Sequence, residues 1–310
     1  MKKIFSICFV LFASSQLFAQ QDPMFSQYMF NSLVLNPAYA GSREVISTTA
    51  LYRNQWVNID GAPKTVTFSA HAPLPNDKVG LGFTFCNDRL GVTNTNNLGL
   101  SYAYRIRFRN KAVLSMGLQA SIMQYQADFA SVRHSFPPNV NDPSFSMVVN
   151  RWLPNFGVGL WYYTNKFYAG LSMPNILTNQ LNEDQQVFRT SQRARQSRHL
   201  FLTAGYVFGL SPTLKLKPSA LLKYVPNAPI EFDINANLWF YDIFAVGVSY
   251  RTRDSFIGMV EIQATPQLGI GYAYDYTLTP LTRYTSGSHE IMVRYEFGFS
   301  RTRIITPRYF

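Results

Sequence analysis

The sequence predicts an all-β protein, a transmembrane antiparallel β-barrel of about 14 strands with a short N-terminal helix as a plug segment. The 310 residues are 47% hydrophobic and only 15% charged, against roughly 25% charged residues in soluble domains. The mean hydropathy is nevertheless −0.07, and no stretch after the N-terminal leader approaches the roughly 18 apolar residues of a membrane-spanning helix. Long segments instead alternate apolar and polar residues, and the connections between them alternate between short and long. This combination favours a barrel.

Residues 1–19 have the layout of a secretory signal peptide. Lys2 and Lys3 precede an apolar run over 4–12, and small and polar residues continue to Ala19. We expect this leader to be removed, because the apolar run is too short for a retained anchor across a hydrocarbon layer of ~30 Å. The remaining chain has one cysteine, Cys86, which excludes a disulfide framework and a cysteine metal site.

Residues 20–46, which include "QDPMFSQYMFNSLVLNPAYAGSR", form a separate N-terminal segment. Asp22 and Pro23 are typical of a helix start. Asn36-Pro37 is typical of a helix end, because the residue before a proline is disfavoured in the α region. The pattern therefore predicts a short, mostly apolar helix over 23–33.

Exposed aromatic patches are unfavourable in water unless a partner covers them. We expect the predicted helix to pack into the periplasmic mouth of the barrel, or to present its aromatic side chains to a periplasmic partner. The candidate plug or partner-binding residues are Phe25, Tyr28, Phe30, Asn36 and Pro37.

Strict alternation defines the strands of the barrel, which we expect over 47–299. In 231–240, Ile234 and its apolar neighbours alternate with Asn235 and other polar residues, so that the sheet has a lipid-facing side and a lumen-facing side. Asn235 is expected to face a roomy lumen. The predicted strands are 47–56, 64–73, 79–87, 97–108, 112–126, 153–163, 167–173, 199–207, 214–224, 231–240, 243–252, 256–264, 268–276 and 289–299.

The connections sort by parity. Those after even-numbered strands are short turns, whereas the two longest, near 127–152 and 174–198, follow odd-numbered strands. Outer-membrane barrels have short periplasmic turns and longer extracellular loops. We therefore expect the long connections outside the cell, and the tail, residues 300–310, in the periplasm.

The formal net charge is +11, and removal of the two leader lysines leaves 26 basic against 17 acidic residues. Four arginines cluster in the second long loop, where they could bind lipopolysaccharide phosphates or an acidic partner, or simply be solvated. Nucleic acid is not an expected partner of an exported barrel. The candidate loop contacts are Arg189, Arg193, Arg195 and Arg198.

Catalytic and metal-binding patterns are weak. Ser69 and His71 lie two residues apart on one inward face, but no carboxylate that could orient them stands nearby in the sequence. The other histidines are scattered and lack metal-ligand spacing. We predict no catalytic, metal or cofactor site, and no enzyme activity.

Motifs at the two ends of the mature chain carry a family resemblance. "DPMFSQYMFN" followed by "NPAYAG", together with the ending "TPRYF", closely resembles the PorP/SprF family, outer-membrane proteins of the type IX secretion and gliding motility apparatus of Bacteroidetes. The resemblance implies a 14-strand barrel that works with the type IX machinery, or with one secreted surface protein such as an adhesin, and it supplies no catalytic residues. The alternative function is a passive or ligand-specific outer-membrane pore with the N-terminal segment as a hatch.

Overall fold

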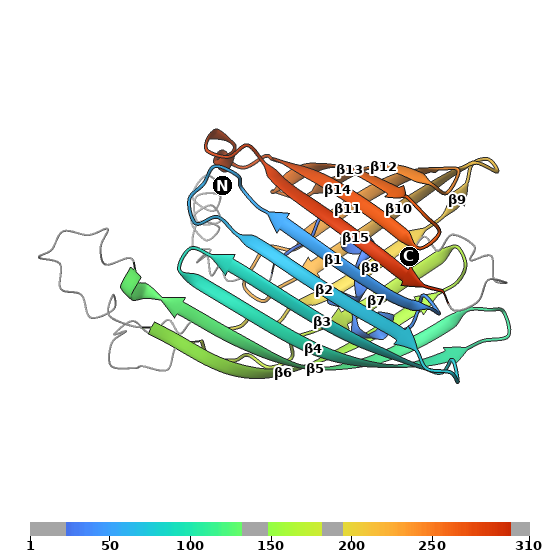
Figure 1. The fold of residues 1–310 in the computed structure, drawn as a ribbon, viewed down its shortest axis with the longest axis horizontal. Coiled ribbons are helices and arrows are strands. Elements are labelled where there is room, and N and C mark those ends of the chain that lie inside the picture. Colours follow the sequence, from blue (N-terminus) through green and yellow to red (C-terminus); the bar gives the residue numbers. More distant parts are fainter. Residues whose placement is uncertain (1–22, 132–147, 182–194, 299–310) are drawn as a thin grey trace, which may run out of the picture.

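The structure, a computed structural model, describes residues 23–131, 148–181 and 195–298. One antiparallel sheet closes on itself into a barrel, because β1 (Ile46–Asn54) pairs with both β2 (Lys64–Pro73) and β15 (Ser288–Phe297) (Figure 1). Closure removes the exposed sheet edges that a membrane does not tolerate. The other strands are β3 (Val79–Leu90), β4 (Thr93–Arg107), β5 (Val113–Asp128), β6 (Val148–Tyr163), β7 (Phe167–Met173), β8 (Leu200–Tyr206), β9 (Phe208–Gly209), β10 (Leu214–Tyr224), β11 (Glu231–Phe240), β12 (Phe244–Arg251), β13 (Ser255–Gln263) and β14 (Leu268–Thr277).

The barrel has 14 strands, because β8 and β9 are two parts of one strand. Both pair with β10, and the interruption falls at Val207, whose backbone N–H donates to the Lys166 carbonyl oxygen at 2.7 Å. The predicted fold class is thus confirmed. None of the helices in the described part of the chain is long and apolar enough to cross a membrane.

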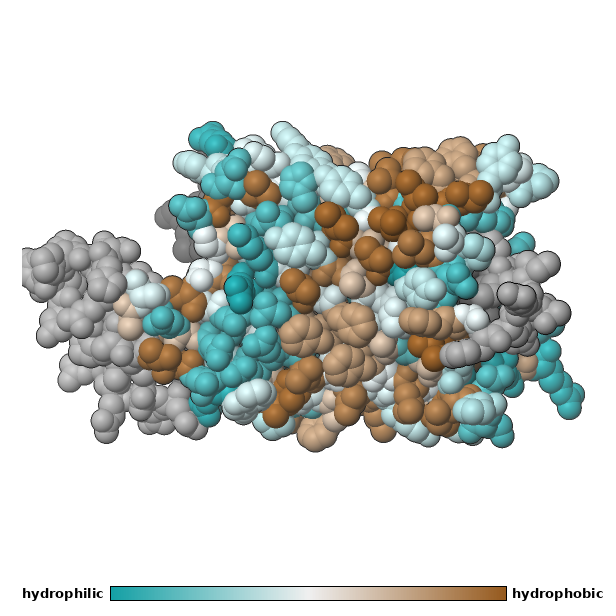
Figure 2. All heavy atoms as spheres, viewed as in Figure 1, coloured by the Kyte–Doolittle hydropathy of each residue, from teal (hydrophilic) through white to brown (hydrophobic). Residues whose placement is uncertain are grey.

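The outer surface of the barrel is apolar and the inner surface is polar. Leu100, Ile234 and Val248 point outward and are 65%, 60% and 63% exposed. Their strand neighbours point inward and are buried, including polar and charged residues. Figure 2 shows the apolar side chains gathered over the middle of the barrel wall. This is the arrangement of a sheet that faces lipid outside.

The two ends of the barrel differ. We call the end where β1, β3, β5, β7, β10, β12 and β14 finish the loop end, and the opposite end the turn end. The connections after β5 and β7 are the longest, and both lie at the loop end as predicted. The β3–β4 connection is an exception to the parity, since only Gly91 and Val92 separate these strands.

Strands β3 to β6 are longer than the sequence predicted. β4 begins at Thr93 rather than at 97, and β6 begins at Val148 rather than at 153. The prediction stopped where apolar residues stop alternating, but the sheet pairing continues through residues with amide side chains, such as Asn94 and Asn150. Backbone pairing does not require an apolar side chain, so these strands extend past the apolar band.

The predicted helix over 23–33 is wrong. The chain instead forms three short 3-10 turns, η1 (Tyr28–Phe30), η2 (Ser32–Val34) and η3 (Pro37–Tyr39); a further 3-10 turn, η6 (Pro280–Arg283), follows β14. The reason is that the backbone N–H groups of Ser26 and Gln27 donate to the Glu290 carboxylate, each at 2.8 Å. The chain is held by the barrel wall rather than by its own helical hydrogen bonds.

Residues 23–45, the lumen segment, run through the inside of the barrel from one end to the other. Pro23 lines the same cavity at the loop end as Arg53 and Glu231. Gly41 contacts His71 at the turn end. The expectation that residues 23–33 pack into the mouth with the short turns is therefore wrong, since Ser26 and Gln27 bind Glu290 near the opposite, loop end.

Candidate functional site

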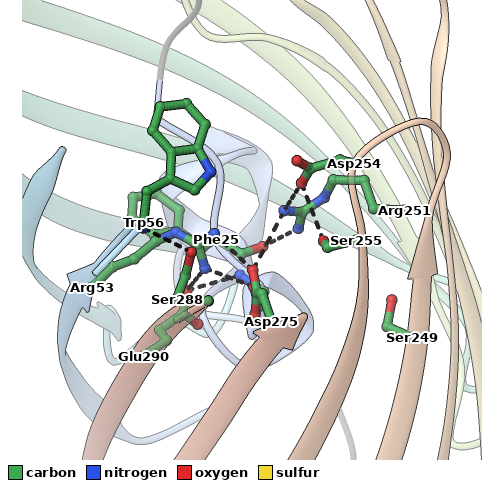
Figure 3. A network of polar contacts seen from close by, with 12 residues as sticks. Phe25, Arg53, Trp56, Ser249, Arg251, Asp254, Ser255, Asp275, Ser288 and Glu290 are labelled. Atoms are coloured by element: carbon green, nitrogen blue, oxygen red, sulfur yellow. Dashed lines mark hydrogen bonds and ion pairs between the residues drawn. The ribbon is translucent and has the colours of Figure 1, made fainter. Parts of the chain in front are cut away.

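A network of buried charges holds the start of the lumen segment at the loop end (Figure 3). The Ser26 hydroxyl donates to Asp275 at 2.7 Å and accepts from the Arg53 guanidinium at 2.7 Å. Arg53 also bonds the Asp275 carboxylate at 2.7 Å and Glu290 at 3.1 Å. Three strands, β1, β14 and β15, thus contribute charges that meet on one serine of the segment.

Arg251 extends this network on the other side of Phe25. Its guanidinium pairs with Asp233 at 2.9 Å and with Asp254 at 3.3 Å, and it donates to the backbone carbonyl oxygen of Phe25 at 3.4 Å. Buried charges are stable only when paired and hydrogen-bonded. The network therefore binds the segment strongly to the wall, because the removal of any partner leaves a buried charge without its counter-ion.

Aromatic residues of the lumen segment fill the middle of the barrel. Phe25, Tyr28 and Phe30 are all buried. The Tyr28 hydroxyl accepts a hydrogen bond from the Asn235 side chain at 2.6 Å, and the Lys217 ammonium lies 5.3 Å from the centre of the Phe30 ring.

The sequence led us to expect a roomy lumen beside Asn235, but the structure shows that this part of the lumen is filled. Asn235 is 1% exposed and lies against Tyr28. The aromatic side chains therefore occupy the space that an open pore of this strand number would leave to water.

Asn36 and Pro37 place the segment against the wall of β5 and β6. The Asn36 side chain accepts from the Ala38 backbone N–H at 2.9 Å, which caps η3, and donates to the Leu160 carbonyl oxygen at 2.9 Å. The wall opposite is built from glycine: a Cβ at Gly117 would overlap the backbone of Ala38, and one at Gly159 would overlap the Asn36 side chain. The wall and the segment fit each other residue by residue.

A second set of contacts holds the lumen segment at the turn end. The Gly41 backbone N–H donates to His71 Nδ1 at 3.1 Å, its carbonyl oxygen accepts from Arg105 at 2.5 Å, and Arg43 forms a buried ion pair with Glu296. Tyr39 packs edge-on against Trp161 with ring centres 5.2 Å apart. The segment is thus tethered at both ends of the lumen.

Ser69 and His71, considered above as a faint catalytic pair, both bind the lumen segment. The Ser69 hydroxyl donates to the Asn31 side chain at 2.7 Å, and His71 holds Gly41. Sequence reasoning missed the tethers themselves. One signal could have indicated them. Arg53, Asp275 and Glu290 occupy inward-facing positions of strands in which apolar and polar residues alternate, and a charge that points inward requires a partner.

Among the described residues, cavities lie beside the segment at two places. One of about 400 Å³ opens at the loop end and is lined by Pro23, Met24, Arg53, Trp56, Glu231 and Arg251, among others. The other, about 170 Å³, lies between the segment and β3–β5 and includes Phe25, Cys86 and Met123. In the part of the chain that the structure describes, no cluster of histidine, cysteine or acidic residues could hold a metal ion.

The candidate loop arginines are only partly described. Arg189 and Arg193 lie outside the described residues. Arg195 pairs with Gln180 in an isolated bridge, and Arg198 Nε donates to the Ile176 carbonyl oxygen at 2.7 Å. Both side chains are exposed at the loop end.

A family model supports the motif resemblance. The model described as "Type IX secretion system membrane protein PorP/SprF" matches residues 17–295. No curated protein matches the chain.

Several solved membrane barrels resemble the chain at low identity. A Pseudomonas aeruginosa FadL homologue has a TM-score of 0.47 and 13% identity, covering 89% of this chain and 95% of its own. The outer membrane protein Omp33 of Acinetobacter baumannii has a TM-score of 0.46 and 9% identity, covering 82% and 98%. The CymD monoaromatic hydrocarbon channel has a TM-score of 0.46 and 12% identity, covering 88% and 93%. Likenesses this distant leave the function of this chain open.

Proposed function

The chain belongs to the PorP/SprF family of type IX secretion system membrane proteins, and on that premise we propose that it is a closed outer-membrane platform. In this function the barrel supports the secretion or the surface attachment of a partner protein, such as an adhesin, together with the type IX machinery. It does not itself conduct solutes.

The observation that carries the proposal is the lumen segment. It traverses the barrel, buries Phe25, Tyr28 and Phe30 inside it, and is tethered by buried ion pairs at Arg53 and Arg43. Breaking one partner of a buried ion pair costs about 3–5 kcal/mol. A plug held in this way at both ends favours a closed barrel over a channel that opens readily.

The proposed orientation places the loop end outside the cell, as the loop lengths favour. The loop arginines, including Arg195 and Arg198, are then available at the surface to an acidic partner or to lipopolysaccharide. The turn end and its short connections face periplasmic partners of the secretion machinery.

Two measurements test the proposal together. The purified barrel in a planar bilayer is expected to pass no steady ion current, whereas a variant that lacks residues 24–41 conducts. Cells without the protein are expected to keep their outer-membrane permeability while at least one type IX cargo protein fails to reach or remain on the surface. A normal set of surface proteins in those cells would contradict the proposal.

One observation favours the alternative, a ligand-specific pore with a hatch. The cavity of about 400 Å³ at the loop end is lined by both charged and apolar side chains and could hold a small solute. This alternative predicts a current through the unmodified barrel, or lost uptake of a solute in cells without the protein.

A further inference from the structure

An array of amide side chains covers the outer face of the barrel at the loop end. We call it the amide face. The side chains form one hydrogen-bonded ladder across four strands: Asn87 donates to Asn94 at 2.8 Å and to Asn96 at 2.7 Å, and longer bonds continue the ladder to β5 and β6. Its members are Asn87, Asn94, Asn96, Gln124, Gln126 and Asn150.

The amide face points away from the lumen. Thr95, Asn97 and Tyr125, which alternate with its members, line the inner cavity beside the lumen segment. On the same outward side, the strands continue directly into the apolar band at Leu98 and Ile122, which are exposed. Figure 2 shows this change as hydrophilic side chains over the left ends of β2–β5, next to the apolar middle of the wall.

Trp152 marks the depth at which this change occurs. It is 57% exposed on the outward face of β6 and stands directly opposite Gln124 of the amide face. Tryptophan concentrates where hydrocarbon meets the polar head groups of a membrane. The amide face thus begins at head-group depth rather than out in free solvent.

A pair of cations extends the same face onto β2. Lys64 stands directly opposite Arg89 across the β2–β3 pair, and Arg89 stands opposite Asn94. Like charges directly opposite each other destabilise a sheet. The ion pairs found among the residues that the structure describes include neither Lys64 nor Arg89, so the pair presents a positive charge beside the amides.

We propose that the amide face, with Lys64 and Arg89, binds the head group of a phosphorylated glycolipid of the outer leaflet. Amides both donate and accept hydrogen bonds, as sugar hydroxyls do, and the two cations supply charge-assisted bonds for phosphate. The depth, the neutral array and the adjacent cations all match a head group of sugars and phosphates. The inference rests on the proposed orientation, with the loop end outside, but not on the role in secretion.

The first test removes the cations. The probe is deep-rough lipopolysaccharide, which carries lipid A and inner-core sugars, titrated against the purified barrel in detergent. The double variant Lys64→Gln and Arg89→Gln is expected to bind about 25-fold more weakly, because each basic residue near an anionic lipid surface contributes about a factor of five. The matched control, Arg109→Gln with Lys111→Gln, removes the same charge from the turn end and is expected to bind like the unmodified protein.

The second test separates sugar recognition from charge alone. The variant Asn96→Ala removes one amide of the ladder without changing the net charge, and is expected to weaken the binding of the same lipopolysaccharide. Phosphatidylglycerol, an anionic lipid without sugars, is expected to bind the unmodified barrel more weakly than lipopolysaccharide does. Heat-induced change in gel migration shows that each variant is folded.

Equal lipopolysaccharide binding by the unmodified barrel and the Lys64/Arg89 variant would overturn the proposal, as would equal binding of the two lipids. These measurements use the isolated barrel, so they are independent of whether cells need the protein for secretion.

Discussion

Gly117 lies at a close approach of the lumen segment to the barrel wall. A Cβ there would overlap the backbone of Ala38, whereas a Cβ at Gly258, on the lipid-facing side of β13, would meet nothing within 4 Å. We expect Gly117→Val to lower the free energy of unfolding by about 1–3 kcal/mol through overpacking, with Gly258→Val close to neutral. Urea titration of the barrel in lipid vesicles measures both. Equal stability of the two variants would mean that the segment does not pack against β5.

Ile234 and Asn235 are neighbours on β11 with opposite environments. Ile234 faces lipid, and Ile234→Arg should cost about 2–4 kcal/mol if it lies near the bilayer midplane. Asn235 is buried against Tyr28, so Asn235→Arg should cost at least as much, because an unpaired charge is then forced into a filled space. The same vesicle titration compares the two. A nearly neutral Asn235→Arg would indicate an open lumen.

The tether of the lumen segment can be tested at Arg53 on β1. Arg53→Ala leaves Asp275 and Glu290 buried without their shared cation, and is expected to destabilise the protein by about 3–5 kcal/mol. The control is Arg107→Ala on β4. Arg107 forms an ion pair with Glu44 at 2.9 Å, and its side chain is 45% exposed. An exposed ion pair contributes about 0–1 kcal/mol to stability. Chemical unfolding in vesicles is the measurement. Similar losses from both variants would contradict a tethering role for Arg53.

The elements that face lipid were predictable from the sequence. Strands such as β2, β7, β10 and β11 were predicted to the residue, because one-sided contact with lipid imposes strict alternation. The extensions of β4 and β6 were missed, because their outward residues carry amide side chains and these segments therefore show no alternation of apolar and polar residues. The lumen segment was predicted as a helix from local signals at Asp22 and Pro23, whereas its backbone is bound by Glu290, more than 260 residues away along the chain.

The candidate site was predictable only in part, because its contacts join residues that are far apart in the sequence. The aromatic residues Phe25, Tyr28 and Phe30 stand out in a short apolar stretch, so their need for cover was evident from composition. The identity of the residues that cover them depends on which strands meet across the lumen. That information lies in the closure of β1 on β15, a pairing that no local pattern specifies.

The path of the lumen segment has a consequence for the whole molecule. β1 begins and β15 finishes at the turn end, which outer-membrane barrels place in the periplasm. The lumen segment runs from there back to the loop end, so Met24, at the start of the described chain, lies in the cavity of the opposite mouth. In the proposed orientation the beginning of the segment is therefore reached from outside the cell.

A cysteine-labelling experiment tests the orientation and the path of the segment together. In a Cys86→Ser background, Met24→Cys is placed in the loop-end cavity and Asn110→Cys in the exposed β4–β5 turn at the opposite end. A small, charged thiosulfonate reagent that does not cross the outer membrane is expected to label Met24→Cys in intact cells, and Asn110→Cys only after that membrane is opened. The reverse order would mean that the barrel is inverted. Labelling of both sites only after opening would mean that the lumen segment does not reach the outer mouth, because Met24 would then lie on the periplasmic side with the turns.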